Sequence, residues 1–365
     1  MNASPENKTP LLKRAEKLGT LVQAWVSGKT GDCVAAAQRT VDEGLFLQDD
    51  VRFALTHIRE SVRPESLVGW SGKLPDHAEP LNVKPVLCLH AGNLPMVGLQ
   101  DVLACIIAGL PYCGKLSRKD PHLMRSLLET LEEQLREAEL SFSTEISFFS
   151  GLEAGAVLFS GSEKSVPGVF ELLEASQIKL AGARKLIRTA HSSAAWIPAA
   201  AVSDRDQLGS QLAEAIFRYG GRGCRSLTTI FTDAEPVQLL HLIRQAAQAQ
   251  FPNAATLTLN PQLRYREAFF RAMKRETEVF GGRLLAVTEP DPHTDGLLTI
   301  TPGTLADLSA FLGKYGPRIQ SVYVPDGAMR SEIAGKRSEP LSRAQTPPVH
   351  WQPDGTDALE WLMRL

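Results

Sequence analysis

The stretch Pro85-Val86-Leu87-Cys88-Leu89-His90 is a continuous apolar run near the first quarter of the chain. Such a run is typical of a strand that is buried on both faces of a parallel sheet. It ends in Ala91-Gly92-Asn93-Leu94-Pro95 and is followed by an apolar segment that we interpret as a helix over residues 98–109. This order of strand, turn and helix predicts the first unit of a parallel α/β sheet.

The same alternation of strands and helices continues on the C-terminal side of that stretch. Asp120-Pro121 begins an amphipathic helix, with Asp as N-cap and Pro at the first helical position. We expect further strands at 111–117, 156–160, 176–181 and 194–197. Repeated alternation of this kind predicts a doubly wound α/β sheet.

A second α/β region follows, after a helix predicted over 206–219. The residue patterns predict strands at 227–232, 283–287, 297–301 and 319–324, and helices at 236–250, 261–275 and 305–314. Residues 10–62 form a helical N-terminal region, and residues 64–84 are interpreted as a loop because of their Pro and Gly content. The tail over 331–354 lacks periodicity, and 357–365 is expected to be a short closing helix.

The bulk composition excludes several classes of protein. The 365 residues include 43% hydrophobic and 22% charged residues with a net charge of −2, so nothing indicates binding to nucleic acid or to an anionic membrane. No stretch approaches the roughly 20 apolar residues that a membrane helix needs. The N-terminus has no apolar signal core, and the five cysteines show no paired metal spacing. These features predict a cytoplasmic protein with reduced thiols.

One cysteine has an unusual setting. The segment Gly220-Gly221-Arg222-Gly223-Cys224-Arg225-Ser226 follows the predicted helix 206–219 and precedes a predicted strand. Arg222 and Arg225 flank Cys224, and nearby positive charge together with converging backbone N–H groups stabilises a thiolate, the nucleophilic form of cysteine. The alternative is a buried small side chain at a turn. The glycine-rich setting favours the reactive thiol.

Four short pieces carry a family resemblance. Ala91-Gly92-Asn93-Leu94-Pro95 is similar to an Asn-x-Pro turn, and Lys115-Leu116-Ser117-Arg118-Lys119-Asp120-Pro121 to a Lys-Pro-Ser-x-x-x-Pro element, with Leu116 in place of the proline. Phe159-Ser160-Gly161-Ser162 is similar to a Phe-Thr-Gly-Ser turn, and Gly223-Cys224 to a catalytic cysteine loop. In this order, over residues 85–325, they resemble the aldehyde dehydrogenase superfamily. More narrowly, they resemble the acyl-CoA reductases related to the fatty-acid reductase of bacterial bioluminescence.

The resemblance implies an aldehyde-dehydrogenase-like fold with two doubly wound α/β domains. On this basis we expect a helical N-terminal segment at 1–63 and a dinucleotide-binding domain at 64–203. A catalytic domain that carries the cysteine is expected at 204–330, and a C-terminal arm with a closing helix at 331–365.

The resemblance also implies roles for two catalytic residues. The Cys224 thiolate attacks a thioester carbonyl and expels the CoA thiol, which leaves an acyl-cysteine. The Asn93 side-chain amide and the backbone N–H of Cys224 donate to the oxyanion. Asn93 could instead be a plain turn residue. Its place after a buried strand, where α/β sheets bind ligands, favours the catalytic role.

The implied cofactor is NADPH, with NADH also allowed. Lys115 would reach the adenosine ribose, and Ser117 or Arg118 would meet a 2′-phosphate. Gly161 and Ser162 would bind the pyrophosphate at a helix N-terminus, although an ordinary N-cap predicts the same residues. The sequence contains no Gly-x-Gly-x-x-Gly, so binding differs from that in ordinary Rossmann dehydrogenases.

The expected reaction is reduction of an acyl thioester to an aldehyde. Aldehyde-oxidising members of the superfamily carry a glutamate upstream of the cysteine as the base for hydrolysis, and no glutamate occurs here between Glu174 and Glu214. His191 lies in that interval and could act as a base or orient one, but a single histidine near an Ala- and Ser-rich turn is more often a bystander. An acyl-phosphate reductase of the glutamyl-phosphate type, or a non-catalytic relative that binds a nucleotide or a partner, remain the alternatives. The resemblance also allows a homodimer and an acyl-transferring partner protein.

Cys88 and His90 alternate on one strand without further ligands, so we predict no metal site.

Overall fold

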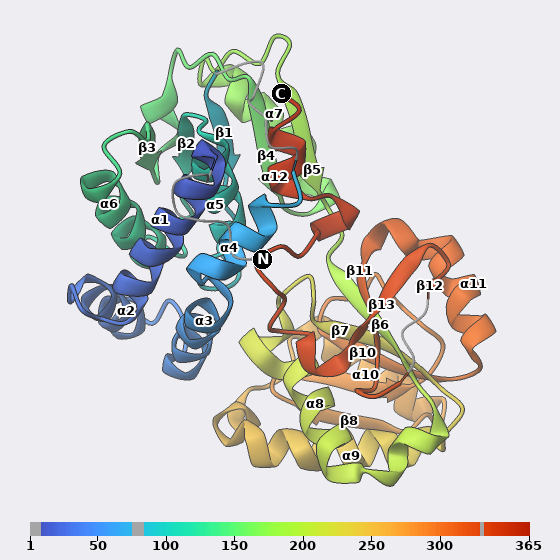
Figure 1. The fold of residues 1–365 in the computed structure, drawn as a ribbon. Helices are drawn as coiled ribbons and strands as arrows, with labels where there is room; N and C mark the ends of the chain where they lie inside the picture. Colours follow the sequence, from blue (N-terminus) through green and yellow to red (C-terminus); the bar gives the residue numbers. More distant parts are fainter. Residues whose placement is uncertain (1–8, 75–83, 329–331) are drawn as a thin grey trace. The chain divides into compact units, whose positions relative to one another are not determined.

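The structure is a computed structural model that describes residues 9–74, 84–328 and 332–365. Residues 1–8, on which the expectation about a signal core rests, lie outside this description, as do 75–83 of the expected loop. The contacts divide the chain into two compact units (Figure 1). The first unit holds residues 1–189 and 348–365, and the second holds 190–347. We describe each unit separately.

The first unit contains a parallel five-stranded sheet in the order β3-β2-β1-β4-β5. Its strands are β1 (Val86–Leu89), β2 (Tyr112–Lys115), β3 (Leu140–Ser143), β4 (Ala156–Ser160) and β5 (Arg184–Arg188). Helices α5 (Leu99–Ala108), α6 (Leu123–Gln134) and α7 (Val166–Ala175) connect them. The first three residues of β1 are at most 1% exposed, which confirms the strand expected at the start of the sequence analysis.

Four N-terminal helices and one C-terminal helix belong to the same unit. They are α1 (Pro10–Val26), α2 (Asp32–Asp42), α3 (Gln48–Ser61), α4 (Pro64–Ser71) and α12 (Ala358–Leu362). Their apolar faces share one core with the sheet. Trp70 of α4 also donates from Nε1 to the Asp357 carboxylate at 3.0 Å, which ties α4 to the end of the chain. The expected loop at 64–84 is thus wrong for α4, because Pro64 begins a helix where its missing N–H has no cost.

The second unit contains an eight-stranded sheet in the order β12-β13-β11-β6-β7-β10-β9-β8. The strands from β13 to β9 are parallel, and β12 and β8 are antiparallel at the two edges. The strands are β6 (Ser192–Ile197), β7 (Leu227–Thr232), β8 (Thr277–Phe280), β9 (Arg283–Val287), β10 (Leu297–Pro302), β11 (Ile319–Val324), β12 (Glu332–Ile333) and β13 (Lys336–Pro340). The helices are α8 (Arg205–Phe217), α9 (Pro236–Gln250), α10 (Pro261–Ala272) and α11 (Leu305–Tyr315).

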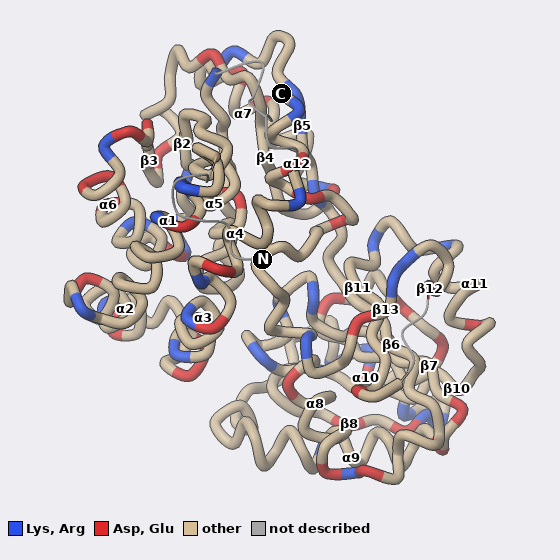
Figure 2. Tube along the Cα trace, in the orientation of Figure 1, with Lys and Arg blue, Asp and Glu red and all other residues tan. Residues whose placement is uncertain are grey.

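Short 3₁₀ helices occupy several connections in the described chain. They are η2 (Ile146–Phe149), η3 (Glu163–Ser165), η4 (Ala199–Ser203), η5 (Arg218–Gly221), η6 (Pro252–Thr256), η7 (Gly316–Arg318), η8 (Leu341–Arg343) and η9 (Pro353–Gly355). No helix of the described residues has the length and apolar character needed to cross a membrane. Basic and acidic residues are interspersed along both units (Figure 2).

Four details of the expected fold need correction. Residues 176–181 form a turn with a single bridge at Lys179, and the strand lies later, at β5. The tail after 331 is not a simple surface arm, because β12 and β13 join the second sheet. Helix α6 begins at Leu123, so Asp120 is not its N-cap. The expected domain boundary at 203/204 falls after β6, which pairs with β7 and β11 of the second unit.

Candidate active site

The candidate cofactor residues lie at one edge of the first unit's sheet. Asn93 follows β1, Lys115 is the last residue of β2, and Gly161 follows β4. Because these strands are parallel neighbours, their carboxyl ends meet at this edge. The chain order reverses at β1, with β2 on one side and β4 on the other. This is the position at which open α/β sheets bind ligands.

The Asn93 loop packs directly against the turn after β2. A Cβ atom placed on Gly92 would lie 2.1 Å from Ser117 Oγ, so only glycine allows this approach. On the other side, Asp120 Oδ2 accepts a 2.7 Å hydrogen bond from the backbone N–H of Met96. Asp120 is 3% exposed, and burial raises its pKa to about 6. The structure therefore brings the Asn93 and Ser117 segments together, with Asp120 as their buried anchor.

The basic residues after β2 are engaged with an acidic neighbour that the sequence analysis missed. Arg118 donates to the carboxylate of Glu145, from Nη2 at 2.5 Å and from Nε at 3.2 Å, and both side chains are exposed. Hydrogen bonding from Arg118 lowers the pKa of Glu145. Lys115 is half-buried, and burial followed by the charge of Arg118 lowers its pKa. Glu145 thus opposes an anion at Arg118, and only the parallel pairing of β2 with β3 reveals it.

The turn after β4 differs from the expected helix N-terminus. Gly161 donates its N–H to the carbonyl of Arg188, and Ser162 is exposed. The Ser162 hydroxyl lies 3.1 Å from Ser165 Oγ, and the three residues of η3 separate this turn from α7. The N-cap of α7 is Ser165. Gly161 and Ser162 therefore lie at the expected sheet edge, but they do not open the α-helix.

Cys224 lies in the second unit, on the connection between η5 and β7. It is half-buried and lies three residues before Leu227, at the amino edge of the sheet. Its carbonyl accepts a 3.0 Å hydrogen bond from Ser193 Oγ. The turn is closed twice, since Ser226 N donates to the Gly223 carbonyl at 2.9 Å and Gly223 N donates to Ser226 Oγ at 3.2 Å. Hydrogen bonds on both sides of the cysteine therefore fix its backbone.

The two arginines beside Cys224 differ. Arg225 is 5% exposed, and its guanidinium donates to Glu339, at 2.8 Å from Nη2, and to the carbonyl of Ala344. Burial opposes its charge, whereas anionic neighbours, including a thiolate at Cys224, raise its pKa above the ordinary value. Arg222 is exposed and donates from Nε to the Tyr219 carbonyl.

His191 lies at the same sheet edge as Cys224. It directly precedes β6, whose residue Ser193 pairs with Leu227 of the parallel neighbour β7. A role for His191 as a base, or as a group that orients one, stays a prediction. Both aspartates in the interval without glutamate belong to α8, where Asp204 is the N-cap and Asp206 lies in the first turn.

The other thiols and the strand histidine are core groups. Cys88, Cys105 and Cys113 are buried, and burial raises the pKa of Cys113 to about 11. His90 Nε2 lies 2.6 Å from the Tyr112 hydroxyl, and burial lowers the histidine pKa. Among the described residues, no three His, Cys, Asp or Glu side chains are grouped to hold a metal ion.

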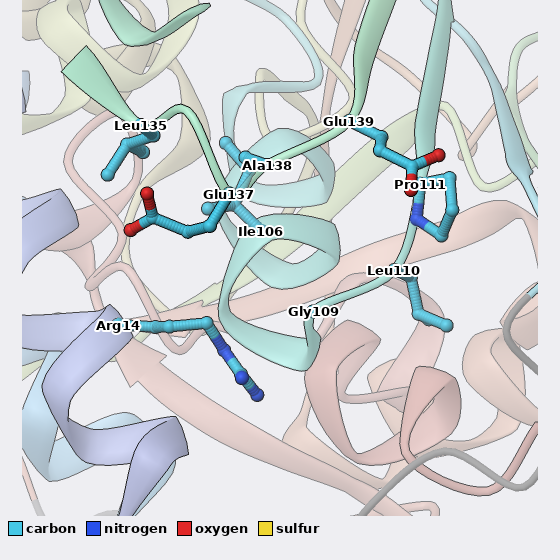
Figure 3. Close-up of a pocket in the computed structure, with 9 residues that line it drawn as sticks. All are labelled: Arg14, Ile106, Gly109, Leu110, Pro111, Leu135, Glu137, Ala138 and Glu139. Atoms are coloured by element: carbon cyan, nitrogen blue, oxygen red, sulfur yellow. The ribbon is translucent and has the colours of Figure 1, made fainter.

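A pocket in the first unit lies at the opposite edge of its sheet from the candidate cofactor residues (Figure 3). Its wall includes Gly109 at the end of α5 and Pro111 just before β2. Arg14 reaches in from α1 and donates from Nε to the carbonyl of Ile107 at 2.9 Å. A basic group at the last carbonyls of a helix stabilises its C-terminus. The pocket therefore surrounds a structural cap.

The comparisons agree on the fold. No protein-family model matches the chain, and no curated protein matches it. Among solved structures, aldehyde dehydrogenase 21 from Physcomitrella patens in complex with succinate is similar with a TM-score of 0.63 and 12% identity, over 96% of this chain and 84% of that one. A methylmalonate-semialdehyde dehydrogenase from Oceanimonas doudoroffii is similar with a TM-score of 0.58 and 16% identity, over 87% and 74%. An NAD-dependent benzaldehyde dehydrogenase from Corynebacterium glutamicum is similar with a TM-score of 0.60 and 12% identity, over 88% and 76%. The chain has an aldehyde-dehydrogenase-like fold.

Proposed function

We propose that this protein reduces an acyl thioester, such as an acyl-CoA, to an aldehyde with NADPH, through an acyl intermediate on Cys224. The observation that carries this proposal is the contrast among the thiols. Cys224 is half-buried on a glycine-rich turn beside the buried cation Arg225, whereas Cys33, Cys88, Cys105 and Cys113 are buried core groups. A cysteine at a turn beside positive charge is typical of a nucleophile.

The proposed chemistry begins at the sulfur. Cys224 Sγ bonds to the thioester carbonyl carbon, the carbon–sulfur bond to CoA breaks, and the CoA thiolate leaves and takes up a proton. NADPH held by the residues at the carboxyl edge of the first unit's sheet would supply the hydride that reduces the acyl carbon. The bond between that carbon and Sγ then breaks, which releases the aldehyde and restores the thiolate. The side-chain amide of Asn93 is the proposed donor to the oxyanion, together with the N–H of Cys224.

The carboxyl edge of the first unit's sheet fits a dinucleotide. Gly92 lets its loop pack directly against Ser117, and Lys115 and Ser117 supply donors at the end of β2. Lys115 would reach the adenosine ribose, Ser117 or Arg118 would meet a 2′-phosphate, and Gly161 and Ser162 would lie near the pyrophosphate. Arg118 supports a 2′-phosphate and hence NADPH, and NADH is the alternative because Glu145 pairs with Arg118.

The absence of a glutamate upstream of the cysteine supports the proposed direction of the reaction. Hydrolysis of an acyl-cysteine needs a group that activates water, whereas hydride reduction does not. The interval between Glu174 and Glu214 contains no glutamate, and Asp204 is occupied as a helix cap. The absence of a glutamate favours reduction over oxidation.

The test is acyl transfer to the cysteine. Radiolabelled acyl-CoAs of several chain lengths are incubated with the wild type, with Cys224→Ala and with the matched control Cys33→Ala. We expect label on the wild type and the control, none on Cys224→Ala, and discharge of the label as aldehyde when NADPH is added. A folded wild type that takes no label from any acyl-CoA would refute the proposal. Labelling from acyl phosphates alone would favour the acyl-phosphate reductase.

A further inference from the structure

A second buried arginine contacts the loop that carries Cys224. Arg283, the first residue of β9, is 3% exposed. Its Nη1 donates a 2.8 Å hydrogen bond to the carbonyl of Gly221, three residues before the cysteine. Its Nε and Nη2 have no hydrogen-bond partner among the described residues. Burial lowers the pKa of this guanidinium to about 10. A buried cation with so few partners is costly, so packing alone is a poor reason for its presence.

The loop segment that Arg283 contacts has an unusual backbone. Tyr219, Gly220 and Gly221 have successive φ angles of 57°, 64° and 69°. This left-handed conformation is unfavourable for tyrosine, and it persists only where the surroundings enforce it. A Cβ atom on Gly221 would lie 1.6 Å from Arg283 Nη1, whereas one on Gly220 would meet no atom closer than 3.6 Å. The guanidinium therefore lies directly against Gly221, and Gly220 is in open space.

The sheet topology explains why this contact reaches the cysteine. Strands β7, β10 and β9 are parallel neighbours, so their amino ends lie at one edge. Arg283 begins β9, and Cys224 precedes β7 at that edge. On the strand side of Cys224, the Gly223–Ser226 turn and the Arg225–Glu339 ion pair hold the chain. On the side of Cys224 that faces α8 in the chain, the hydrogen bond from Arg283 to the Gly221 carbonyl holds the loop in the same way.

We propose that Arg283 is a positioning residue that holds the Gly221 carbonyl and thereby sets the backbone and the reactivity of Cys224. The inference rests on the proposed function for its catalytic meaning, but it is tested on the thiol alone. Arg283 acts through the loop and does not touch the substrate.

The experiment measures the rate at which iodoacetamide alkylates Cys224, followed by peptide mass spectrometry from pH 6 to 10, in the full-length protein. We expect Arg283→Met to slow alkylation of Cys224 at pH 7 by tenfold or more and to move the pH profile upward. Arg283→Lys, which keeps a donor and a charge, should recover part of the rate. Binding of NADPH to the first unit should not change. An Arg283→Met protein that is folded and alkylates with the wild-type rate and profile would overturn the proposal.

The glycines give a second test that does not depend on the folding of Arg283→Met. Gly221→Ala and Gly220→Ala share a left-handed backbone, but only the first pushes against Arg283, at 1.6 Å from Nη1, and against the Ile216 carbonyl at 2.6 Å. We expect Gly221→Ala to slow alkylation at least fivefold more than Gly220→Ala does, and equal effects would contradict the proposal. Failure of the enzymatic proposal is distinguishable, because it would appear as absent acyl labelling while the Arg283 variants still change the alkylation rate.

Discussion

The first unit places its candidate residues on an open sheet edge, whereas the second unit holds Cys224 on a loop that buried groups fix. Arg118 and Glu145 form an exposed ion pair, and exposed pairs of this kind contribute little to stability. Arg225 and Arg283, by contrast, are 5% and 3% exposed and hold the loop from within. A nucleophile must be kept in one geometry. At a sheet edge that binds a cofactor, by contrast, an exposed cation can leave its ion-pair partner and bind the ligand. The difference between the two regions is consistent with that division of roles.

The largest expected effect concerns the buried pair of the second unit. Arg225→Met leaves the Glu339 carboxylate without its main partner, and breaking a buried pair in this way typically costs about 3–5 kcal/mol. We expect a loss of about 3 kcal/mol in urea denaturation. The control Arg343→Met changes an exposed side chain nearby and should stay within about 0.5 kcal/mol of the wild type. Equal stabilities for the two variants would remove the contrast between the units.

A pH dependence tests Asp120, the buried carboxyl that holds the Asn93 loop in the first unit. The pKa of Asp120 is about 6 in the folded protein, against an ordinary value of 3.8, so ionisation of this group costs about 3 kcal/mol of stability, at about 1.4 kcal/mol per pKa unit. The free energy of unfolding therefore falls by this amount as the pH rises from about 4 to about 6, and it does not recover above that range. Asp120→Asn should remove it. Urea denaturation between pH 4 and 8 measures the difference between the two proteins, and parallel curves would contradict the assignment.

Asn93 lies on the sheet edge of the first unit, but its predicted role is in the chemistry rather than in cofactor binding. Asn93→Ala removes one donor to the oxyanion and should lower kcat by about a hundredfold, with little change in the binding of acyl-CoA. Steady-state kinetics and equilibrium binding measure the two effects. Asn253→Ala, an exposed control in the second unit, should leave both unchanged. A role of Asn93 in the turn alone would instead lower stability and leave kcat intact.

The smallest expected effect tests the exposed edge itself. Glu145→Gln removes the carboxylate that pairs with Arg118 and repels a 2′-phosphate. We expect the KM for NADPH to fall by about threefold to tenfold and the KM for NADH to change less, because the gain comes from a partly screened surface interaction. Arg118→Gln should act in the opposite direction. Equal changes in KM for NADPH and NADH would show that the Arg118–Glu145 pair does not distinguish the 2′-phosphate.

Much of the secondary structure could be predicted because burial leaves a local pattern. β4, β7, β9 and β11 begin and end at the expected residues, and α9 spans Pro236–Gln250 as predicted. β5 was missed because Arg184, Lys185 and Arg188 interrupt its apolar character at the edge of the sheet. β13 was missed because the Ser- and Pro-containing tail has no periodicity of its own and becomes a strand only by pairing with β11.

The candidate site divides in the same way. The Asn93 turn and the Gly-Gly-Arg-Gly-Cys connection were visible as motifs, since tight turns require particular residues at particular positions. Arg225 was also noticed, but as a neighbour of the thiol, and its ion pair with Glu339 appears only in the structure. The sequence predicts Asp120 as a helix cap, and in the structure its carboxylate accepts from the backbone N–H of Leu123 at the start of α6 and also holds Met96.

The sequence by itself determined which segments are buried strands and which cysteine lies on a turn, because these properties depend on residues close together in the chain. Only the tertiary structure decided which residues hold the loop of that cysteine, and that Glu145 pairs with Arg118 beside the sheet of the first unit. The partners involved are 62 positions apart for Gly221 and Arg283, 114 for Arg225 and Glu339, and 27 for Arg118 and Glu145. No local pattern encodes such pairs, since they form only when parallel strands bring distant segments to one edge of a sheet.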